Sequence, residues 1–301
     1  MLEDIRNNLD KGKFSGMLLT DLSKAFDCLV HDLLIANCSN NLGQWFKANY
    51  LKSNEDKCQL LLNLNSTDLF IKVGNEIIYN STETKLLGVT MDSALKFDAH
   101  ISKLCKKANQ KLHALLRVAK YMSHDKRRII MKSFVTSQFG YCPLVWMFHS
   151  RGLNNRINKI QERALRSVYN DSNSTFNELL IKDNSVTIHH RNLQVLATEI
   201  YKAINDLSAP ILKSIFNVKT NSYNLRNGTT LSTKNIKTVK YGIETLSFRG
   251  PKLWAIVPDT IKNSNSLYEF KSKIKRWRPT GCDCKLCCDY VPNLGYINLQ
   301  I

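Results

Sequence analysis

The sequence predicts an α+β fold in which a strand-rich first third precedes a mostly α-helical region and a basic tail. Short apolar runs separated by turn residues fill residues 14–92, a pattern typical of short strands. From residue 98 apolar residues recur at three- and four-residue steps, the period of an amphipathic helix. Beyond residue 217 the chain is rich in Asn, Ser, Thr and Lys, which indicates an exposed connection. We therefore divide the chain into residues 1–97, 98–216 and 217–301.

Four apolar runs of the first third predict its strands. Residues 14–22 (FSGMLLTDL) read as a strand that ends in a carboxylate, and residues 58–64 (CQLLLNL) as a buried strand. The Gly-Asn-Glu centre of residues 68–80 suits a hairpin turn, and residues 85–92 (KLLGVTMD) predict one more short strand. Residues 30–51 are less regular, with helical spacing from Leu42 to Asn49.

Helical spacing dominates the middle of the chain. The first helix carries its apolar stripe from Ile101 to Ala119, and Ser123 is the expected N-cap of a second helix that Pro143 interrupts. Two further helices follow over residues 157–168 and 193–204. In the tail, the stretch YGIETLSFRGPKLWAIVPDTIKNSNSLYEFKSKIKRW predicts a strand-like piece, an aromatic-bearing turn and a short basic helix.

Composition narrows the cellular setting. No apolar run approaches the roughly 20 residues that cross a bilayer, and MLEDIRNNLDKGK lacks the apolar core of a secretory signal. Nine cysteines, an odd number, favour free thiols over a disulfide framework. We expect a nuclear or cytoplasmic protein that is not secreted and has no membrane partner.

The net charge of +18 is concentrated in the helical region. Residues 1–97 hold 10 Lys or Arg against 12 Asp or Glu, whereas residues 99–170 hold 15 against 2. Such asymmetry points to a polyanionic partner. The alternative is a set of solvated helix faces, but faces that only maintain solubility usually mix both signs.

Asp21 ends the first predicted strand, within the stretch MLLTDLSKAFDCLVHDLL. A carboxylate at a strand end can hold Mg²⁺. Nucleotidyl transfer, however, uses two such ions roughly 4 Å apart, so at least two carboxylates must converge. A single Asp after a strand is also typical of a turn or of a helix N-cap, and both interpretations stay open on this residue alone.

The segment DLSKAFD, with the apolar strand before it and VHDLL after it, resembles the first catalytic palm motif of reverse transcriptases from non-LTR retrotransposons of the LINE and jockey type. The resemblance implies that Asp21 binds the catalytic metal and that the backbone carbonyl of Leu22 faces it. It also implies that Phe26 blocks a ribose 2′-OH and so selects dNTPs.

Further segments resemble the same family in the same order. LGQWFKANYLKSNEDKCQLLLN resembles the palm segment after the catalytic Asp pair, where Lys57 matches a lysine that donates a proton to pyrophosphate. KLLGVTMDSALKFDAHISKL resembles the hairpin under the primer end and the start of the thumb, and the basic helices resemble the thumb. The implied fold is a remnant of a right-hand polymerase palm, then a thumb-like region and a basic tail. The implied partners are RNA, DNA or an RNA–DNA duplex, with Mg²⁺ as the cofactor and dNTPs as the only small-molecule substrate.

One block of the family pattern is missing between Leu34 and Leu42. In the family this block carries a Pro-Gln-Gly motif and the Asp-Asp turn that supplies the other metal ligands, and this chain has neither. Asp21 alone cannot hold two Mg²⁺ ions, and losing ligands that act as one unit removes most of the rate. We therefore expect a truncated, internally deleted polymerase that binds Mg²⁺ unproductively and does not synthesise DNA.

Four cysteines near the C-terminus form a candidate zinc site: Cys282, Cys284, Cys287 and Cys288. Thiolates at short spacing suit Zn²⁺, and four of them would complete a tetrahedron. All four lie within seven residues, which would strain a closed site, and a reduced cysteine-rich tail is the alternative.

Basic residues of the helical region are the candidate nucleic-acid contacts. They would neutralise phosphates without reading bases. The candidates are Lys103, Lys106, Lys107, Arg127, Arg128, Lys159 and Arg163. Besides an inactive polymerase fragment, the chain fits a non-enzymatic, basic helical nucleic-acid-binding protein, or the functionless product of a decaying or mis-spliced element.

Overall fold

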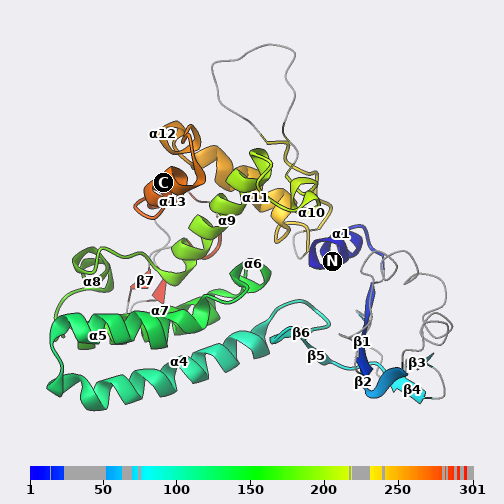
Figure 1. Ribbon diagram of the computed structural model, residues 1–301, viewed down its shortest axis with the longest axis horizontal. Helices are drawn as coiled ribbons and strands as arrows, with labels where there is room; N and C mark the ends of the chain where they lie inside the picture. Colours follow the sequence, from blue (N-terminus) through cyan, green and yellow to red (C-terminus); the bar gives the residue numbers. More distant parts are fainter. Residues whose placement is uncertain are drawn as a thin grey trace, which may run out of the picture. The chain divides into compact units, whose positions relative to one another are not determined.

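The computed structural model forms two compact units, Gly12–Leu95 and Met1–Lys11 with Lys96–Ile301, here called the strand unit and the helical unit (Figure 1). It describes residues 1–13, 15–23, 52–62, 70–73, 76–216, 218, 231–238, 241–279, 282, 284–287, 290–291 and 295–296. The helical spacing predicted from Leu42 to Asn49 lies outside these residues.

The strand unit begins with an antiparallel pair of long strands. Strand β1, Gly16–Ser23, confirms the strand predicted at residues 14–22 and pairs with β2, Lys52–Leu62. The prediction at residues 58–64 located only the second half of β2, because the polar and charged segment before Cys58 has no apolar alternation. Cys58, Leu60 and Leu61 are buried, as expected for this strand.

Two short hairpins complete the strand unit. Strands β3, Phe70–Val73, and β4, Glu76–Tyr79, confirm the hairpin predicted at residues 68–80. The single strand predicted from the apolar pattern of residues 85–92 is wrong, because these residues form a second hairpin of β5, Glu83–Leu86, and β6, Val89–Asp92, at the place where the resemblance implied a hairpin. Leu87 and Gly88 turn the chain with φ of 46° and 85°, the positive values that a tight two-residue hairpin loop requires.

The helical unit opens with the predicted basic helix. Helix α4, Asp98–Val118, buries one stripe that includes Ile101, Cys105, Ala108 and Leu112. A single 3₁₀ turn, η1, extends it over Ala119–Tyr121. The amphipathic period read from the sequence is thus confirmed.

The second predicted helix is present but irregular. Helix α5, His124–Ile130, follows Ser123 at the N-cap position, as predicted. The helix then widens into a π turn, η2, and narrows into a 3₁₀ turn, η3. Pro143 starts the short helix α6. The bounds of these elements are Met131–Val135, Thr136–Phe139 and Pro143–Trp146.

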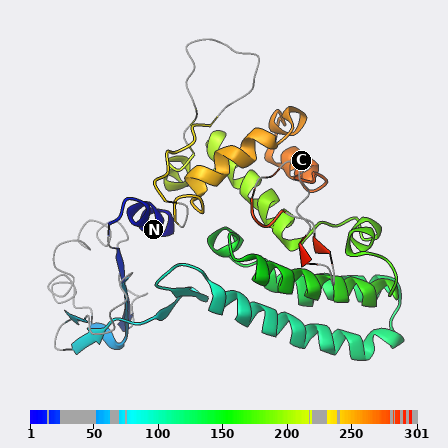
Figure 2. The same ribbon diagram turned by 180° about the vertical axis from the view of Figure 1, so that it is seen from behind.

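Three further helices follow, and they include both helices predicted for residues 157–204. Helix α7 spans Arg151–Tyr169 and α9 spans Ile188–Ile204, each starting about a turn before its predicted apolar stripe. Helix α8, Phe176–Lys182, lies between them and starts with a capping box of Thr175 and Glu178. Both views show α4 and α7 side by side (Figures 1 and 2).

The tail helices pack on α9 rather than forming a separate layer of strands. Tyr201 of α9 stacks on Phe270 at 4.2 Å between ring centroids and donates a hydrogen bond to the carbonyl of Ser264 at 2.7 Å. The strand-like piece predicted near residue 245 is wrong, because these residues enter a helix. The tail elements are α10, Pro210–Lys213; α11, Leu246–Ile256; α12, Asp259–Lys262; α13, Leu267–Ile274; β7, Tyr290–Val291; and β8, Gly295–Tyr296.

The first helix of the chain holds the start of α11. In helix α1, Leu2–Asp10, the carboxylate of Glu3 accepts hydrogen bonds from the backbone N–H groups of Leu246 and Ser247 at 2.8 and 2.9 Å. A carboxylate at a helix N-terminus satisfies donors that the helix itself leaves unpaired. This contact explains why residues after Thr245 become helical. Among the described residues, no helix combines the length and apolarity needed to cross a membrane.

Candidate nucleic-acid interface

The residues matched to the polymerase palm lie on β1 and β2. Asp21 and Leu22 lie opposite Asn54 and Ser53 on the antiparallel ladder. The register shifts just before Asp21, and Lys57 lies in the part of β2 that this shift leaves without a ladder partner. The backbone thus brings Asp21 and Lys57 onto neighbouring strands, and Phe26 lies outside the described residues.

Helix α4 presents exposed lysines on the side away from its buried stripe. Lys103, Lys106 and Lys107 are all exposed, because they fall between the apolar positions that face the core. Long lysine side chains on such a face reach into solvent, where they can meet phosphates.

Helix α7 contributes two more exposed predicted contacts, Lys159 and Arg163. A hydrogen bond of 3.2 Å from Arg156 to the hydroxyl of Ser102 ties the first half of α7 to the start of α4. Arg163 and Leu116 share one cavity further along, so the two helices run in the same direction.

That cavity, here called the basic recess, has a volume of about 620 Å³ and lies where α4, α5 and α7 meet. Four of its lining side chains are cationic and none is acidic. The lining residues are Leu116, Ala119, Lys120, Arg127, Arg163, Arg166, Ser167 and Asn170. A hollow with one sign of charge concentrates an anion's field, and it therefore suits a phosphate group.

The four cations of the basic recess are held to different degrees. Arg166 bonds the carboxylate of Glu162 at 2.7 Å, and Arg127 donates to the carbonyl of Ser167 at 2.8 Å. Lys120 and Arg163 are exposed, and neither forms an ion pair within the described part of the chain. They are the two cations of the recess best placed to meet a ligand.

Lys120 was not among the residues predicted from the sequence. Its ammonium lies 4.8 Å from the centre of the Tyr121 ring, which is itself exposed. The sequence signal for Lys120 was its place next to Tyr121 at the end of a basic helix. A lysine next to an aromatic residue can contact a phosphate while the ring contacts a base.

Arg128 has an intramolecular partner. Its Nε lies 2.5 Å from Oδ1 of the buried Asp183, and its terminal nitrogen donates to the carbonyl of the same residue at 2.7 Å. The hydrogen bond with Asp183 raises the pKa of Arg128. Of the predicted contacts, Arg127 and Arg128 thus serve internal bonds, whereas the lysines of α4 and α7 and Arg163 are exposed.

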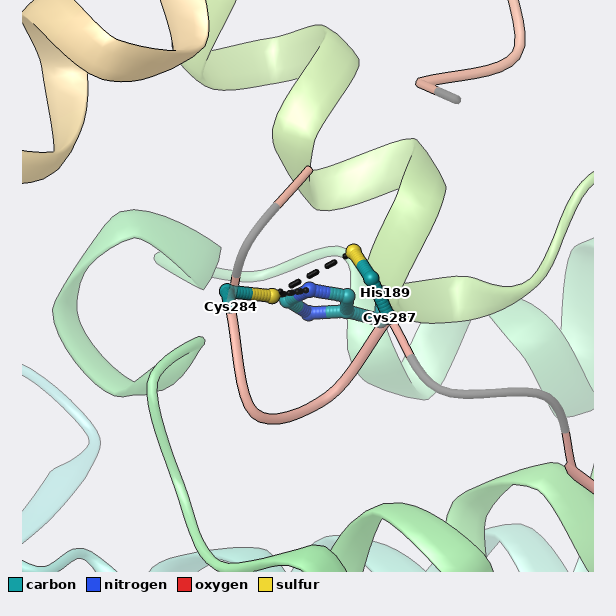
Figure 3. Close-up of side chains that lie close together, drawn as sticks. All are labelled: His189, Cys284 and Cys287. Atoms are coloured by element: carbon teal, nitrogen blue, oxygen red, sulfur yellow. Dashed lines mark hydrogen bonds between the residues drawn. The ribbon is translucent and has the colours of Figure 1, made fainter. Parts of the chain in front are cut away.

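The cysteine segment meets a histidine from another part of the chain (Figure 3). His189 Nε2 lies 3.1 Å from the Sγ of Cys284, which lies 3.2 Å from the Sγ of Cys287. Cys282 joins the cluster through hydrogen bonds to the thiols of Cys284 and Cys287. The fourth predicted cysteine, Cys288, lies outside the described residues.

The pKa shifts favour the metal-binding form of His189 and Cys282, and the protonated thiol of Cys284 and Cys287. Burial, with help from the adjacent His190, lowers the pKa of His189 to about 3, so its imidazole is neutral near pH 7. Hydrogen bonds from Cys284 and Cys287 lower the pKa of Cys282, whereas the hydrogen bond with Cys282 raises the pKa of Cys284. Neutral imidazole and thiolate are the forms that bind a metal ion.

His189 was not predicted as a ligand of this site. Cys284 and His189 are 95 positions apart, and no spacing rule connects them. A pair of adjacent histidines at the start of a helix was the only trace of the site in the sequence.

Comparison with known proteins gives one informative relative. The chain is 28% identical over 134 residues to a protein of Drosophila melanogaster named "Probable RNA-directed DNA polymerase from transposon BS". The match covers 42% of this chain but 15% of the relative. No protein-family model matches the chain, and no solved structure matches it. The match relates the chain to a transposon reverse transcriptase and agrees with the broader part of the sequence-based resemblance.

Proposed function

We propose that this chain is a fragment of a non-LTR, LINE- or jockey-like reverse transcriptase that no longer polymerises and that binds RNA or an RNA–DNA duplex. The observation that carries the proposal is the basic side of the helical unit, where Lys103, Lys106, Lys107, Lys159 and Arg163 are exposed. The match to a transposon RNA-directed DNA polymerase supports a nucleic-acid partner in general.

Loss of polymerisation follows from the metal ligands. Asp21 is the only carboxylate of the chain that matches the family's metal-binding motifs, and the sequence contains no Asp-Asp pair. The two-metal mechanism needs carboxylates from both motifs to hold ions at the attacking and leaving oxygens. On this proposal, Leu22, Phe26 and Lys57 match family positions in the sequence and no longer take part in a reaction.

Binding without polymerisation needs only phosphate contacts. Lysines and arginines on helix faces neutralise phosphates and release counterions, which gives affinity that is tolerant of sequence and falls as salt rises. The basic recess adds a hollow in which Lys120 and Arg163 can hold one phosphate while Tyr121 contacts a neighbouring base.

The first experiment measures binding of the full chain to a fluorescent RNA–DNA duplex and to single-stranded RNA at several salt concentrations. We expect weak binding at low salt that depends little on sequence and weakens steeply as salt rises. No binding at low salt, or binding that salt does not weaken, contradicts this half of the proposal.

The second experiment is primer extension on an RNA template with Mg²⁺ or Mn²⁺. The matched control is Asp21→Ala, which removes the one carboxylate of the family pattern. We expect no extension from either protein, and extension above the control would overturn the loss of polymerisation.

A non-enzymatic nucleic-acid-binding protein is the second candidate. It is favoured by the packing of the helical unit, because the hydrophobic cluster that joins α9 with α11 and α13 includes, among the described residues, none that was matched to the palm. Sequencing of the transcript separates the two, because a longer transcript that restores the missing block near residue 36 would identify the locus as a polymerase.

A further inference from the structure

The thiol and imidazole groups of the cysteine segment converge from two distant parts of the helical unit. His189 is the second residue of α9, and Cys284 and Cys287 flank a tight turn closed by a backbone hydrogen bond of 3.1 Å between them. Their ligand atoms all lie within 4.8 Å of one another. Figure 3 shows the imidazole of His189 and the two sulfurs facing one another between α9 and this turn.

Two members of the cluster, His189 and Cys284, are buried, and Cys282 and Cys287 are half-buried. His189 is 2% exposed and Cys284 is 5% exposed. The second ring nitrogen of His189, Nδ1, is buried and accepts or donates no hydrogen bond among the described residues. The ring nitrogen that faces the thiols is Nε2, and a cation bound there would replace its contact with Cys284 by a stronger one.

The separations suit a tetrahedral ion. With Zn–S bonds of about 2.3 Å and Zn–N bonds of about 2.0 Å, tetrahedral angles place two sulfurs about 3.8 Å apart and a sulfur and a nitrogen about 3.5 Å apart. The observed separations of 3.2 Å and 3.1 Å need to open by about half an ångström, which rotation about the cysteine side chains supplies.

Cys282 is the candidate for the fourth ligand, and its side chain must rotate to bind, because it lies outside the group of three residues whose ligand atoms are within 4.8 Å of one another. Its thiol hydrogen-bonds both Cys284 and Cys287, and it lines an apolar cavity of about 280 Å³ together with Cys284. The ligand order Cys-x-Cys-x₂-Cys from the tail with one histidine from α9 relieves the strain expected of four cysteines within seven residues. Soft thiolates with one imidazole select zinc among the common divalent ions.

We propose that His189, Cys282, Cys284 and Cys287 form a closed zinc site that fastens the cysteine segment to the start of α9. Four protein ligands leave no open position, so the ion is structural rather than catalytic. Neighbouring contacts already hold the same turn, because Arg151 of α7 donates to the carbonyl of Lys285 at 2.7 Å and Lys285 pairs with Glu244.

The test purifies the full chain under reducing conditions with zinc present and measures metal bound per chain, both directly and through the visible spectrum of the Co²⁺-substituted protein. We expect about one zinc per chain and a tetrahedral Co²⁺ spectrum. His189→Ala, Cys282→Ser and Cys284→Ser should each lose the metal. His189→Cys keeps four ligands and should retain the metal, with a stronger thiolate-to-cobalt absorption, so that loss of folding is distinguished from loss of a ligand.

Two matched cysteine variants complete the design. Cys288→Ser and Cys142→Ser remove thiols that the proposal does not use, and both should keep the metal. Three results would overturn the proposal: no zinc in the unmodified chain, loss of zinc on Cys288→Ser with retention on His189→Ala, or a Cys284–Cys287 disulfide that persists under reduction.

Discussion

The guanidinium of Arg128 and the carboxylate of Asp183 meet at 2.5 Å, and this pair joins α5 to the end of α8. Asp183 is 1% exposed, whereas Arg128 is 37% exposed. Tyr169 also donates a hydrogen bond to Asp183 at 3.3 Å. A basic residue that the sequence alone assigns to phosphate binding is therefore a structural partner of a buried acid.

Removing this guanidinium should destabilise the chain. We expect Arg128→Ala to lower the free energy of unfolding by about 2–3 kcal/mol, because it leaves a buried carboxylate without its main partner while solvent screens part of the loss. Urea denaturation measures the effect. The matched control, Lys126→Ala on the exposed side of the same helix, should change stability by at most about 0.5 kcal/mol, and equal losses in the two variants would refute the role of the pair.

Glu3 should stabilise the chain through α11. Glu3→Ala removes the acceptor of two backbone N–H groups at the start of that helix and should cost about 1 kcal/mol. Asp4→Ala is the control, because Asp4 is exposed and, within the described part of the chain, its ion pair is with the N-terminal amine. Thermal unfolding compares them, and a loss no larger for Glu3 than for Asp4 argues against the cap.

The free energy of unfolding should decrease as the pH falls from about 6.5 to about 4, because His149 is buried in its neutral form. Burial lowers the pKa of this histidine to about 4, although its Nδ1 forms a hydrogen bond of 3.1 Å with the carbonyl of Trp146. Between about pH 6.5 and about pH 4 the unfolded chain binds a proton that the folded chain excludes, so up to about 3 kcal/mol is lost as the pH decreases. His149→Gln should reduce this slope by about half in urea titrations, because His189, whose pKa burial lowers to about 3, supplies the rest. The exposed His113→Gln should leave it unchanged, and the same slope for all three proteins would contradict the assignment.

Gly250 should not tolerate a side chain. A Cβ at this position would lie 2.4 Å from Cε1 of the buried Phe216, so Gly250→Ala should destabilise by about 1–3 kcal/mol despite the better helix propensity of alanine. Gly152→Ala is the matched change in α7, where nothing lies within 4 Å, and it should stabilise by up to about 1 kcal/mol. Differential scanning calorimetry distinguishes them, and a Gly250→Ala protein as stable as the Gly152→Ala protein would show that Phe216 moves freely.

The local pattern of apolar residues was sufficient to predict a helix or strand wherever one apolar face of the element packs against the core. Helices α4, α5, α7 and α9 and the β3–β4 hairpin were predicted because their periods of 3.6 and 2 depend on neighbours in sequence, whereas the short helix α8 was not predicted. The β5–β6 hairpin was predicted as one strand because apolar residues lie on both sides of its short turn. Leu87 and Gly88 form that turn. The glycine was the missed signal, since it supplies the positive φ of the turn.

Long-range contacts could not be predicted from the sequence. Helix α11 owes its start to Glu3, at the other end of the chain, and His189 meets cysteines that follow it by more than ninety positions. The same limit applies to the basic residues.

A pattern of charges locates Arg128 and Arg163 on helices. Only the packing shows that the buried carboxylate of Asp183 binds Arg128 and that Arg163 is exposed.

The most direct test of the central claim compares two variants of equal net charge in the nucleic-acid binding assay. The first replaces Lys106, Lys107 and Lys159 with glutamine. The second replaces Lys202, Lys262 and Lys273, which already pair with Glu199, Asp259 and Glu269. The account predicts that the first variant binds an RNA–DNA duplex more weakly, with a salt dependence reduced by up to about 0.9 per lost phosphate contact, and that the second binds nearly as the unmodified chain does. Equal weakening of both variants, or no change in the first, would contradict it.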